Sequence, residues 1–361
     1  MRATVCIIVV IDLLAYAAVA QAEHRGTVFW KTVQTTCDAA AAKPANDLGK
    51  RIAQIAIAEF ARFGGHRIDA NGRLFRFGLT EAEHQEEDDG KRPARLDHLG
   101  WWQVIKYWRA LFGDDFADKL EVRGYRDAST ATQDAQEAAL LRTSAGALLR
   151  AAESVSDPEV REILREAAER TAVIDTPWSA AFVSFVVREA GVEPKAFRFA
   201  NAHRVYIYEA FATSAAEVSN AAGDSAYRAC PLATRPRLGD LICQHREPAL
   251  ADASDGAVRE RIRLELNPGG DARSVRRTHC EVVVHVDAAA RKVYTVGGNV
   301  NQAVSARKLN LRRDMRISTV QKGKCGAGDW TLPLPSATTS AASGSKCSLN
   351  DKKWFVLLQL R

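Results

Sequence analysis

The chain has 361 residues, 47% of them hydrophobic, and its formal net charge at pH 7 is +6. This is the composition of an ordinary globular protein with room for one large domain or two smaller ones. The basic excess favours an anionic partner such as a cell-wall polymer, an anionic lipid or a nucleic acid. No nucleic-acid motif accompanies the basic stretches at residues 273–277 and 307–313. We therefore interpret both as solvated loop and strand-edge charge and do not expect nucleic-acid binding.

The first 22 residues have the features of a secretory signal peptide. Arg2 precedes an apolar stretch at residues 5–19, and Ala20-Gln21-Ala22 fits the small-x-small rule for cleavage. The stretch is too short and interrupted for a membrane span, and no later segment has the length of a membrane helix. We therefore expect a bacterial protein that is periplasmic or secreted, without an integral membrane segment after signal removal.

Cysteine usage agrees with export. Six of the seven cysteines follow the predicted cleavage site, and an even number in an exported protein predicts disulfides. A Cys325–Cys347 pair would tie down the C-terminal tail, and Cys243 and Cys280 could be neighbours on two predicted strands. No C-x-x-C pair occurs, so neither a zinc site nor a redox site is expected.

Helical patterns dominate residues 48–108. Apolar residues at helical spacing predict an amphipathic helix over residues 48–63, and Trp101 opens another helix whose tryptophans we assign to packing. Between them, Asn71-Gly72 predicts a short hairpin within residues 68–77. The charged stretch at residues 81–98 is interpreted as a solvated loop rather than a metal site.

Further helices follow. Residues 136–172 are rich in Ala, Leu, Glu and Arg and predict two helices broken near Ser156-Asp157-Pro158. Pro177-Trp178-Ser179-Ala180-Ala181-Phe182 then opens a strongly apolar helix, with Thr176 as its predicted cap. The first turn of a helix offers free N–H groups and the positive end of the dipole, which suit a nucleophile such as Ser179. An ordinary amphipathic helix with Ser in its first turn is the alternative.

Strand patterns prevail from residue 238 onward, around a polar, partly helical insertion at residues 245–276. In the strand after this insertion, Cys280 and every second residue to Val286 would face a core, whereas His279 and Glu281 share the opposite face. The next strand, beginning near Arg291, runs into Gly298-Asn299. A Ser/Thr/Ala-rich linker is predicted before a final strand at residues 354–360.

The order of these motifs resembles a known group of enzymes. A helix with a nucleophile is followed by Pro236-Arg237-Leu238-Gly239-Asp240-Leu241, by a strand opening on His279 and by a strand ending in Gly298-Asn299. This order resembles the papain-like NlpC/P60 and CHAP cell-wall hydrolases. Within that group the chain is most similar to the uncharacterised bacterial family DUF2272, over roughly residues 45–320. It differs in having Ser179 where those enzymes carry Cys, and Gly297 where CHAP sequences usually have Glu.

The resemblance implies a catalytic site. Ser179 would be the nucleophile, His279 the general base and Asn299 the residue that orients the imidazole. Other candidates for the orienting role are Glu281, Asn301 and Gln302. Candidates for substrate binding are Trp178, His203, Tyr206 and Gln302, with a structural role as the alternative for His203. No cofactor or metal is implied.

Two functions fit these residues. The first is an exported amide hydrolase that cleaves peptide or amide bonds of peptidoglycan, with Ser179 as its nucleophile. The second is an inactive papain-like module that binds the cell wall or a protein partner. The serine favours the second, because a hydroxyl needs more help from its base than a thiol.

The expected fold is α+β, with an antiparallel sheet packed on the nucleophile helix and a helical N-terminal extension. The predicted organisation is a signal peptide at residues 1–22, a mainly helical region at 23–135, a papain-like core at 136–334, a linker at 335–350 and a C-terminal strand at 351–361.

Overall fold

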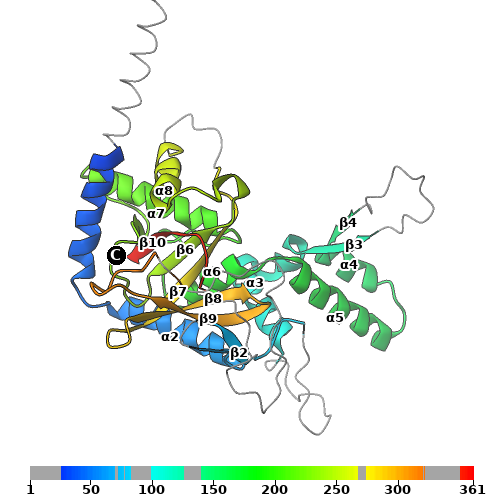
Figure 1. Ribbon diagram of the computed structural model, residues 1–361. Coiled ribbons are helices and arrows are strands. Elements are labelled where there is room, and N and C mark those ends of the chain that lie inside the picture. Colours follow the sequence, from blue (N-terminus) through cyan, green and yellow to red (C-terminus); the bar gives the residue numbers. More distant parts are fainter. Residues whose placement is uncertain are drawn as a thin grey trace, which may run out of the picture.

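The computed structural model describes residues 26–69, 72–76, 78–82, 99–125, 140–266, 274–319, 321 and 350–361. The protein is a mixed α+β structure with an antiparallel sheet and N-terminal helices, as the sequence predicts (Figure 1). The predicted signal peptide, most of the charged stretch at residues 81–98, the linker up to residue 349 and the Cys325–Cys347 pair lie outside the described residues.

One six-stranded sheet organises the protein. Its strand order is β5-β10-β6-β7-β8-β9, and every neighbouring pair is antiparallel. The C-terminal strand β10 therefore lies inside the sheet, beside strands that precede it by more than a hundred positions. The six strands are β5 (Tyr227–Cys230), β6 (Leu241–His245), β7 (Thr278–Asp287), β8 (Lys292–Val300), β9 (Ala303–Asn310) and β10 (Trp354–Leu360).

The Gly239-Asp240 pair closes this sheet against a helix. Gly239 has φ +84°, and a Cβ there would lie 2.5 Å from the Cα of Gly49 in α2 (Asp47–Arg62). The buried Asp240 carboxylate accepts hydrogen bonds from the backbone N–H groups of Arg237 and Leu360, both at 2.8 Å. The Gly239-Asp240 pair therefore has a structural role. Gly239 lets α2 pack closely against this turn, and Asp240 binds the last residue of β10.

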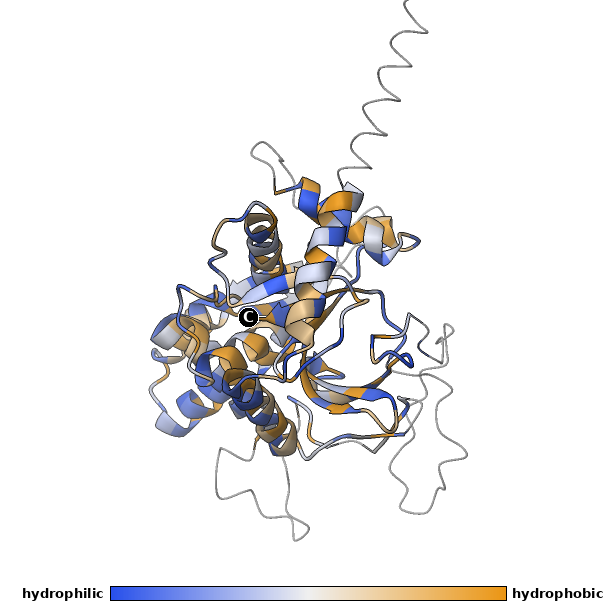
Figure 2. Cartoon of the chain, turned by 90° about the vertical axis from the view of Figure 1, so that its left-hand side faces the viewer, coloured by the Kyte–Doolittle hydropathy of each residue, from blue (hydrophilic) through white to orange (hydrophobic). Residues whose placement is uncertain are grey.

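Helices cover both faces of the sheet. Most of them have an apolar side on the core and a polar side toward solvent, so orange and blue residues alternate around the helices in Figure 2, whereas α6 is buried along most of its length. The five helices named below pack in one core on the same face of the sheet, with α2 toward β8 and β9 and with α7 and α8 toward β5 and β10 (Figure 1). The N-terminal helical segment, residues 26–41, packs on the other face through Val33 and Cys37. The main helices around the sheet are α2, α3 (Gly100–Phe112), α6 (Ser179–Glu189), α7 (His203–Val218) and α8 (Asp255–Leu264).

The predicted helix at residues 48–63 and the hairpin around Gly72 are confirmed by α2, β1 (Arg67–Ile68) and β2 (Leu74–Arg76). The Trp-rich segment is α3. Trp101 and Trp108 are fully buried in its core, which confirms their packing role. Short 3-10 helices at Gly113–Lys119 (η2) and Pro248–Leu250 (η3) complete these regions.

A second region projects to one side of the sheet (Figure 1). It holds β3 (Glu121–Tyr125), β4 (Leu140–Ser144), α4 (Ala145–Ala152) and α5 (Pro158–Asp175). The break predicted near Pro158 is confirmed, but the helix expected at residues 140–144 is wrong. Those residues pair with β3, and Ser144 then caps α4 by accepting from the Ala147 N–H at 3.1 Å.

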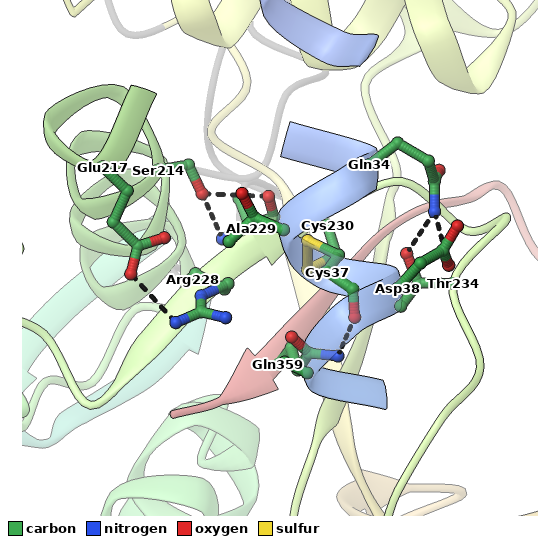
Figure 3. Close-up of a disulfide and its surroundings, with 12 residues drawn as sticks. Gln34, Cys37, Asp38, Ser214, Glu217, Arg228, Ala229, Cys230, Thr234 and Gln359 are labelled. Atoms are coloured by element: carbon green, nitrogen blue, oxygen red, sulfur yellow. Dashed lines mark hydrogen bonds and ion pairs between the residues drawn. A yellow bond between two sulfur atoms is a disulfide. The ribbon is translucent and has the colours of Figure 1, made fainter. Parts of the chain in front are cut away.

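A disulfide fastens the N-terminal helical segment, residues 26–41, to the sheet (Figure 3). Cys37 is bonded to Cys230 of β5, 193 positions later, and the Gln359 side chain donates to the Cys37 carbonyl. A second disulfide joins Cys243 of β6 to Cys280 of β7, which are directly opposite in the sheet. The predicted proximity of Cys243 and Cys280 is confirmed.

Strand β7 differs from its predicted one-sided pattern. Every residue from Thr278 to Val284 is buried, because helices and loops cover both faces of the sheet at this end. A β-bulge between Val283 and His285 also interrupts the alternation of faces. His279 and Glu281 are therefore interior groups. Across the described residues, no helix combines the length and apolar character needed to span a membrane.

Candidate active site

Ser179 is the first residue of α6. The residue before it, Trp178, occupies the cap position, and in the described part of the chain its side chain makes no cap bond to the N–H groups of the first turn. The prediction that Thr176 caps this helix is wrong. Its hydroxyl instead accepts from the Glu121 N–H of β3 at 2.8 Å. The predicted location of the serine in a first helical turn is confirmed.

Trp178 fixes the start of this helix. Its ring is fully buried, lies 6.0 Å from that of Phe63 in a stacked arrangement, and contacts the Tyr107 ring at 5.8 Å. Its indole N–H donates to the Glu81 carboxylate at 2.5 Å, and the Glu81 N–H donates to the Gln302 carbonyl at 2.8 Å. Trp178 therefore packs in the core beneath Ser179 instead of facing solvent.

His203 is the side chain that contacts Ser179. Its Nε2 lies 2.7 Å from the Ser179 Oγ, and both residues begin a helix, α6 for the serine and α7 for the histidine. Ser184 holds these helices together, because its hydroxyl donates to the Ala200 carbonyl and accepts from the Ala200 N–H. We did not predict this contact between Ser179 and His203 from the sequence.

The other nitrogen of His203 is an acceptor. The Cys280 N–H donates to its Nδ1 at 3.2 Å, and the Tyr206 hydroxyl also hydrogen-bonds to it. An amide N–H can only donate, so Nδ1 carries no proton and the neutral ring carries its proton on Nε2. Burial lowers the pKa of His203 well below 6.5, with the His279 and Arg246 charges adding to the effect. At neutral pH, His203 therefore donates to the Ser179 oxygen and cannot accept its proton.

His279 has the opposite environment. Its Nε2 lies 3.3 Å from the Glu281 carboxylate, which also accepts from Thr295 at 2.6 Å and forms an ion pair with Arg307. These three partners of Glu281 belong to three different strands of the sheet. Although Glu281 is fully buried, the Arg307 charge and the hydrogen bonds hold its pKa at about 2. The ionised carboxylate therefore keeps the His279 proton on Nε2 and leaves Nδ1 as the acceptor nitrogen.

The two histidines are neighbours. Their ring centroids are 5.0 Å apart in an edge-to-face arrangement, so His279 lies beside the Ser179–His203 pair. Burial lowers the pKa of His279, while Glu281 opposes this shift. The chain thus places a hydroxyl, a histidine with a fixed donor nitrogen and a histidine with a fixed acceptor nitrogen in one buried cluster, which we call the histidine pair site (Ser179, His203, Tyr206, His279 and Glu281).

Asn299 and Gln302 take other positions. Asn299, with φ 52°, lines a cleft together with His279, but no hydrogen bond between the two side chains occurs in the described part of the chain. The carboxylate of Glu281 occupies the bonding position on the imidazole. The Gln302 side chain is exposed, and only its backbone contacts the site, through Glu81.

Two glycines make room for the site. A Cβ at Gly297 would lie 2.7 Å from the Glu281 Cγ and 3.1 Å from the His279 Nε2. A Cβ at Gly298 would lie 2.5 Å from the Phe182 Cβ of α6. A larger side chain such as glutamate at position 297 would collide with Glu281, so the carboxylate on His279 is supplied by β7.

Sequence reasoning missed two contributors. Arg307 belongs to a basic stretch that we interpreted as solvated, yet its side chain is only 4% exposed and pairs with Glu281. Glu81 belongs to the segment interpreted as a loop, yet it is buried against Trp178 and burial raises its pKa to about 7. The burial of both side chains results from contacts between segments that are distant in sequence. A local sequence pattern therefore could not predict it.

A family model described as "Uncharacterized protein conserved in bacteria (DUF2272)" matches residues 96–360. The chain belongs to the DUF2272 family. The matched region includes every member of the histidine pair site and all six strands of the sheet. No curated protein and no solved structure matches the chain.

Proposed function

We propose that this DUF2272 protein is an exported amide hydrolase of the papain-like type that acts on peptide or amide bonds of peptidoglycan. The observation that carries the proposal is the histidine pair site: Ser179 at a helix N-terminus, in hydrogen-bond contact with one histidine and beside a second histidine that is bound to an ionised carboxylate. The two disulfides are compatible with an oxidising, extracytoplasmic compartment.

His279 is the general base in this proposal. Its acceptor nitrogen takes the Ser179 proton as Oγ bonds to the amide carbon, and the Glu281 carboxylate stabilises the imidazolium that forms. N–H groups in the first turn of α6 stabilise the oxyanion. His279 then passes the proton to the amine that leaves, and water hydrolyses the resulting ester by the same route in reverse.

His203 is a donor in this mechanism. Its Nε2–H holds the Ser179 oxygen in place, and the Cys280 N–H and Tyr206 keep the tautomer fixed. The substrate class is supported by the motif order and by the net positive charge, which suits the anionic cell wall.

An inactive binding module is the second candidate. It is favoured by one observation: Ser179 is only 7% exposed and accepts a hydrogen bond from a neutral donor, which does not raise its nucleophilicity. In such a module the buried cluster would support the fold, and the exposed cleft beside His279 would do the binding.

Digestion of sacculi separates the two candidates. Purified protein lacking the predicted signal peptide, Ser179→Ala and Ser179→Cys are each incubated with sacculi, and released fragments are identified by mass spectrometry. A serine hydrolase releases fragments that Ser179→Ala does not release, and the fragments identify the bond. Fragments from Ser179→Cys alone would indicate a folded but disarmed site, and no fragments from all three would reject hydrolysis of the wall.

A further inference from the structure

A cleft of about 380 Å³ opens beside His279. Its walls come from the end of β6, the β8–β9 turn, β9 and the residues just before β10, which are distant in sequence but adjacent in the sheet. The cleft is lined by Gln244, His245, Arg246, His279, Asn299, Val300, Asn301, Arg307, Asp351, Lys352 and Lys353. Its volume suits a small polar group or a short peptide rather than a folded partner.

Positive charge dominates this lining. Two arginines and two lysines face one aspartate, since Glu281, the partner of Arg307, does not line the cleft. Arg246 and Lys353 have exposed side chains that make no ion pair or side-chain hydrogen bond within the described part of the chain. Arg246 and His279 line the same cleft, and the Arg246 charge lowers the pKa of both His203 and His279.

An unsatisfied donor points to the same ligand chemistry. The Asn301 Nδ2 is buried in the wall of the cleft and has no hydrogen-bond partner among the described residues. Asn301 has φ 53°, a left-handed conformation that the tight β8–β9 turn imposes. A buried amide N–H₂ without a partner is costly, and a rotation of the Asn301 side chain into the cleft would let it donate to an acceptor oxygen on a ligand.

We propose that this cleft binds a carboxylate group of the substrate next to the amide bond that is cleaved. The proposal rests on the proposed function, because it assigns a substrate group to the same site. Arg246 would bind the carboxylate through its planar fork, Lys353 would add charge, and the Asn301 amide would donate to a carboxylate oxygen. The scissile amide would then lie over His279, between the anion site and Ser179.

A titration that needs no turnover tests the proposal. The imidazole carbon–proton signals of His279 are followed by NMR in Ser179→Ala protein with labelled histidine, and they are assigned from a His279→Gln spectrum. Glutarate, glutaramide and inorganic phosphate are added in turn as probes. We expect a saturable shift with glutarate, no shift with glutaramide, and weaker binding of phosphate than of glutarate.

Matched variants identify the residues. Arg246→Gln should weaken glutarate binding at least tenfold, because it removes the positive charge and the guanidinium fork, and Asn301→Ala about threefold, because it removes one neutral donor group. Arg313→Gln, which changes an exposed arginine outside the cleft, should leave binding unchanged. Unchanged melting temperatures would show that the variants are folded.

Each outcome decides the proposal. Equal shifts with glutarate and glutaramide, no shift with glutarate, or full binding by Arg246→Gln would overturn it. Tighter, Arg246-dependent binding of phosphate would replace the carboxylate with a phosphate group. The titration is independent of sacculus digestion, so an anion site without hydrolysis, or hydrolysis without an anion site, can be told apart.

Discussion

The two histidines of the site lie side by side but have opposite surroundings. Within the described part of the chain, the hydrogen-bond partners of His203, at the start of α7, are the Cys280 N–H and the Tyr206 hydroxyl at Nδ1 and the Ser179 hydroxyl at Nε2. His279, in β7, is bound to a carboxylate whose charge is stabilised by Arg307. Under the proposed mechanism, proximity to Ser179 therefore does not identify the general base. The hydrogen bonds on the far side of each ring do, because they decide which nitrogen carries the proton.

The largest expected effect tests this comparison directly. His279→Gln should lower the rate of hydrolysis by roughly 10²–10⁴-fold, because general-base catalysis is lost. His203→Gln should lower it by about tenfold or less, because the glutamine amide can still donate to the Ser179 oxygen. Initial rates on soluble wall fragments measure both.

His285→Gln, an exposed histidine later in β7, is the matched control and should keep the parent rate. The acid limb of the wild-type rate profile should lie at lower pH than that of an unperturbed histidine, because burial lowers the pKa of His279. An equal or larger loss in His203→Gln than in His279→Gln would reverse the two assignments.

The next largest effect is the loss of stability on removing the Glu281 carboxylate, which binds His279. Glu281→Gln should destabilise the protein by about 3–5 kcal/mol, because it leaves the buried Arg307 without a counter-charge. Urea unfolding at pH 7 measures this difference. The control is Glu121→Gln, which breaks a half-exposed pair with Arg123 and should cost under about 1 kcal/mol.

The same variant also reports on catalysis. Glu281 raises the pKa of His279 against the effect of burial, so its loss should move the acid limb of the rate profile to lower pH. A purely structural role for Glu281 would change stability and leave this limb in place. Because the pKa of Glu281 is lowered to about 2 from 4.5, its contribution to stability is complete above pH 4.5 and is lost as the pH falls toward 2.

Much of this molecule could be predicted from local patterns. The amphipathic spacing of α2, the helix start at Ser179 and the apolar run of β10 are each encoded within about a dozen residues. The disulfide partners Cys243 and Cys280 followed from their location on neighbouring strands.

The remaining features depend on pairings between distant segments. Residues 140–144 carry a helical composition but become a strand because β3 offers them a partner. His203 meets Ser179 only because Ser184 fastens α6 to the segment before α7. The same holds for Arg307, whose burial requires β7, β8 and β9 to be paired in register. No window of sequence contains these contacts, so periodicity could not reveal them.

A smaller effect is the pH dependence of stability that Glu81, beneath Ser179, should cause. Burial raises the pKa of Glu81 to about 7 from 4.5, so the folded state holds a proton that the unfolded state releases. The Glu81 contribution therefore makes the protein less stable as the pH rises from about 4.5 to 7, and Glu81→Gln should remove this slope, by roughly 1–3 kcal/mol over the interval. Urea unfolding at pH 5 and pH 7 measures it.

The glutamine retains an acceptor for the Trp178 indole, so the helix start should keep its position. Glu159→Gln, at an exposed site in α5, should keep the parent slope. Asp240 also has a pKa raised to about 7, but it is present in every one of these proteins and cancels in the comparison. An unchanged slope in Glu81→Gln would contradict the buried, protonated state assigned to Glu81.

The smallest effect tests whether Gly297 exists to admit Glu281. Gly297→Ala adds a Cβ that must push the Glu281 Cγ away from 2.7 Å and crowd the His279 Nε2, while Ser179 and His203 keep their contact. We expect a loss of stability of about 1–2 kcal/mol and a fall in rate of several fold. The matched change Gly124→Ala has no atom within 4 Å of its Cβ and should alter neither property. If the rate falls while the His203 signals stay unchanged by NMR, the sensitive half of the site is the carboxylate-bound histidine, as the opposite surroundings of the two rings require.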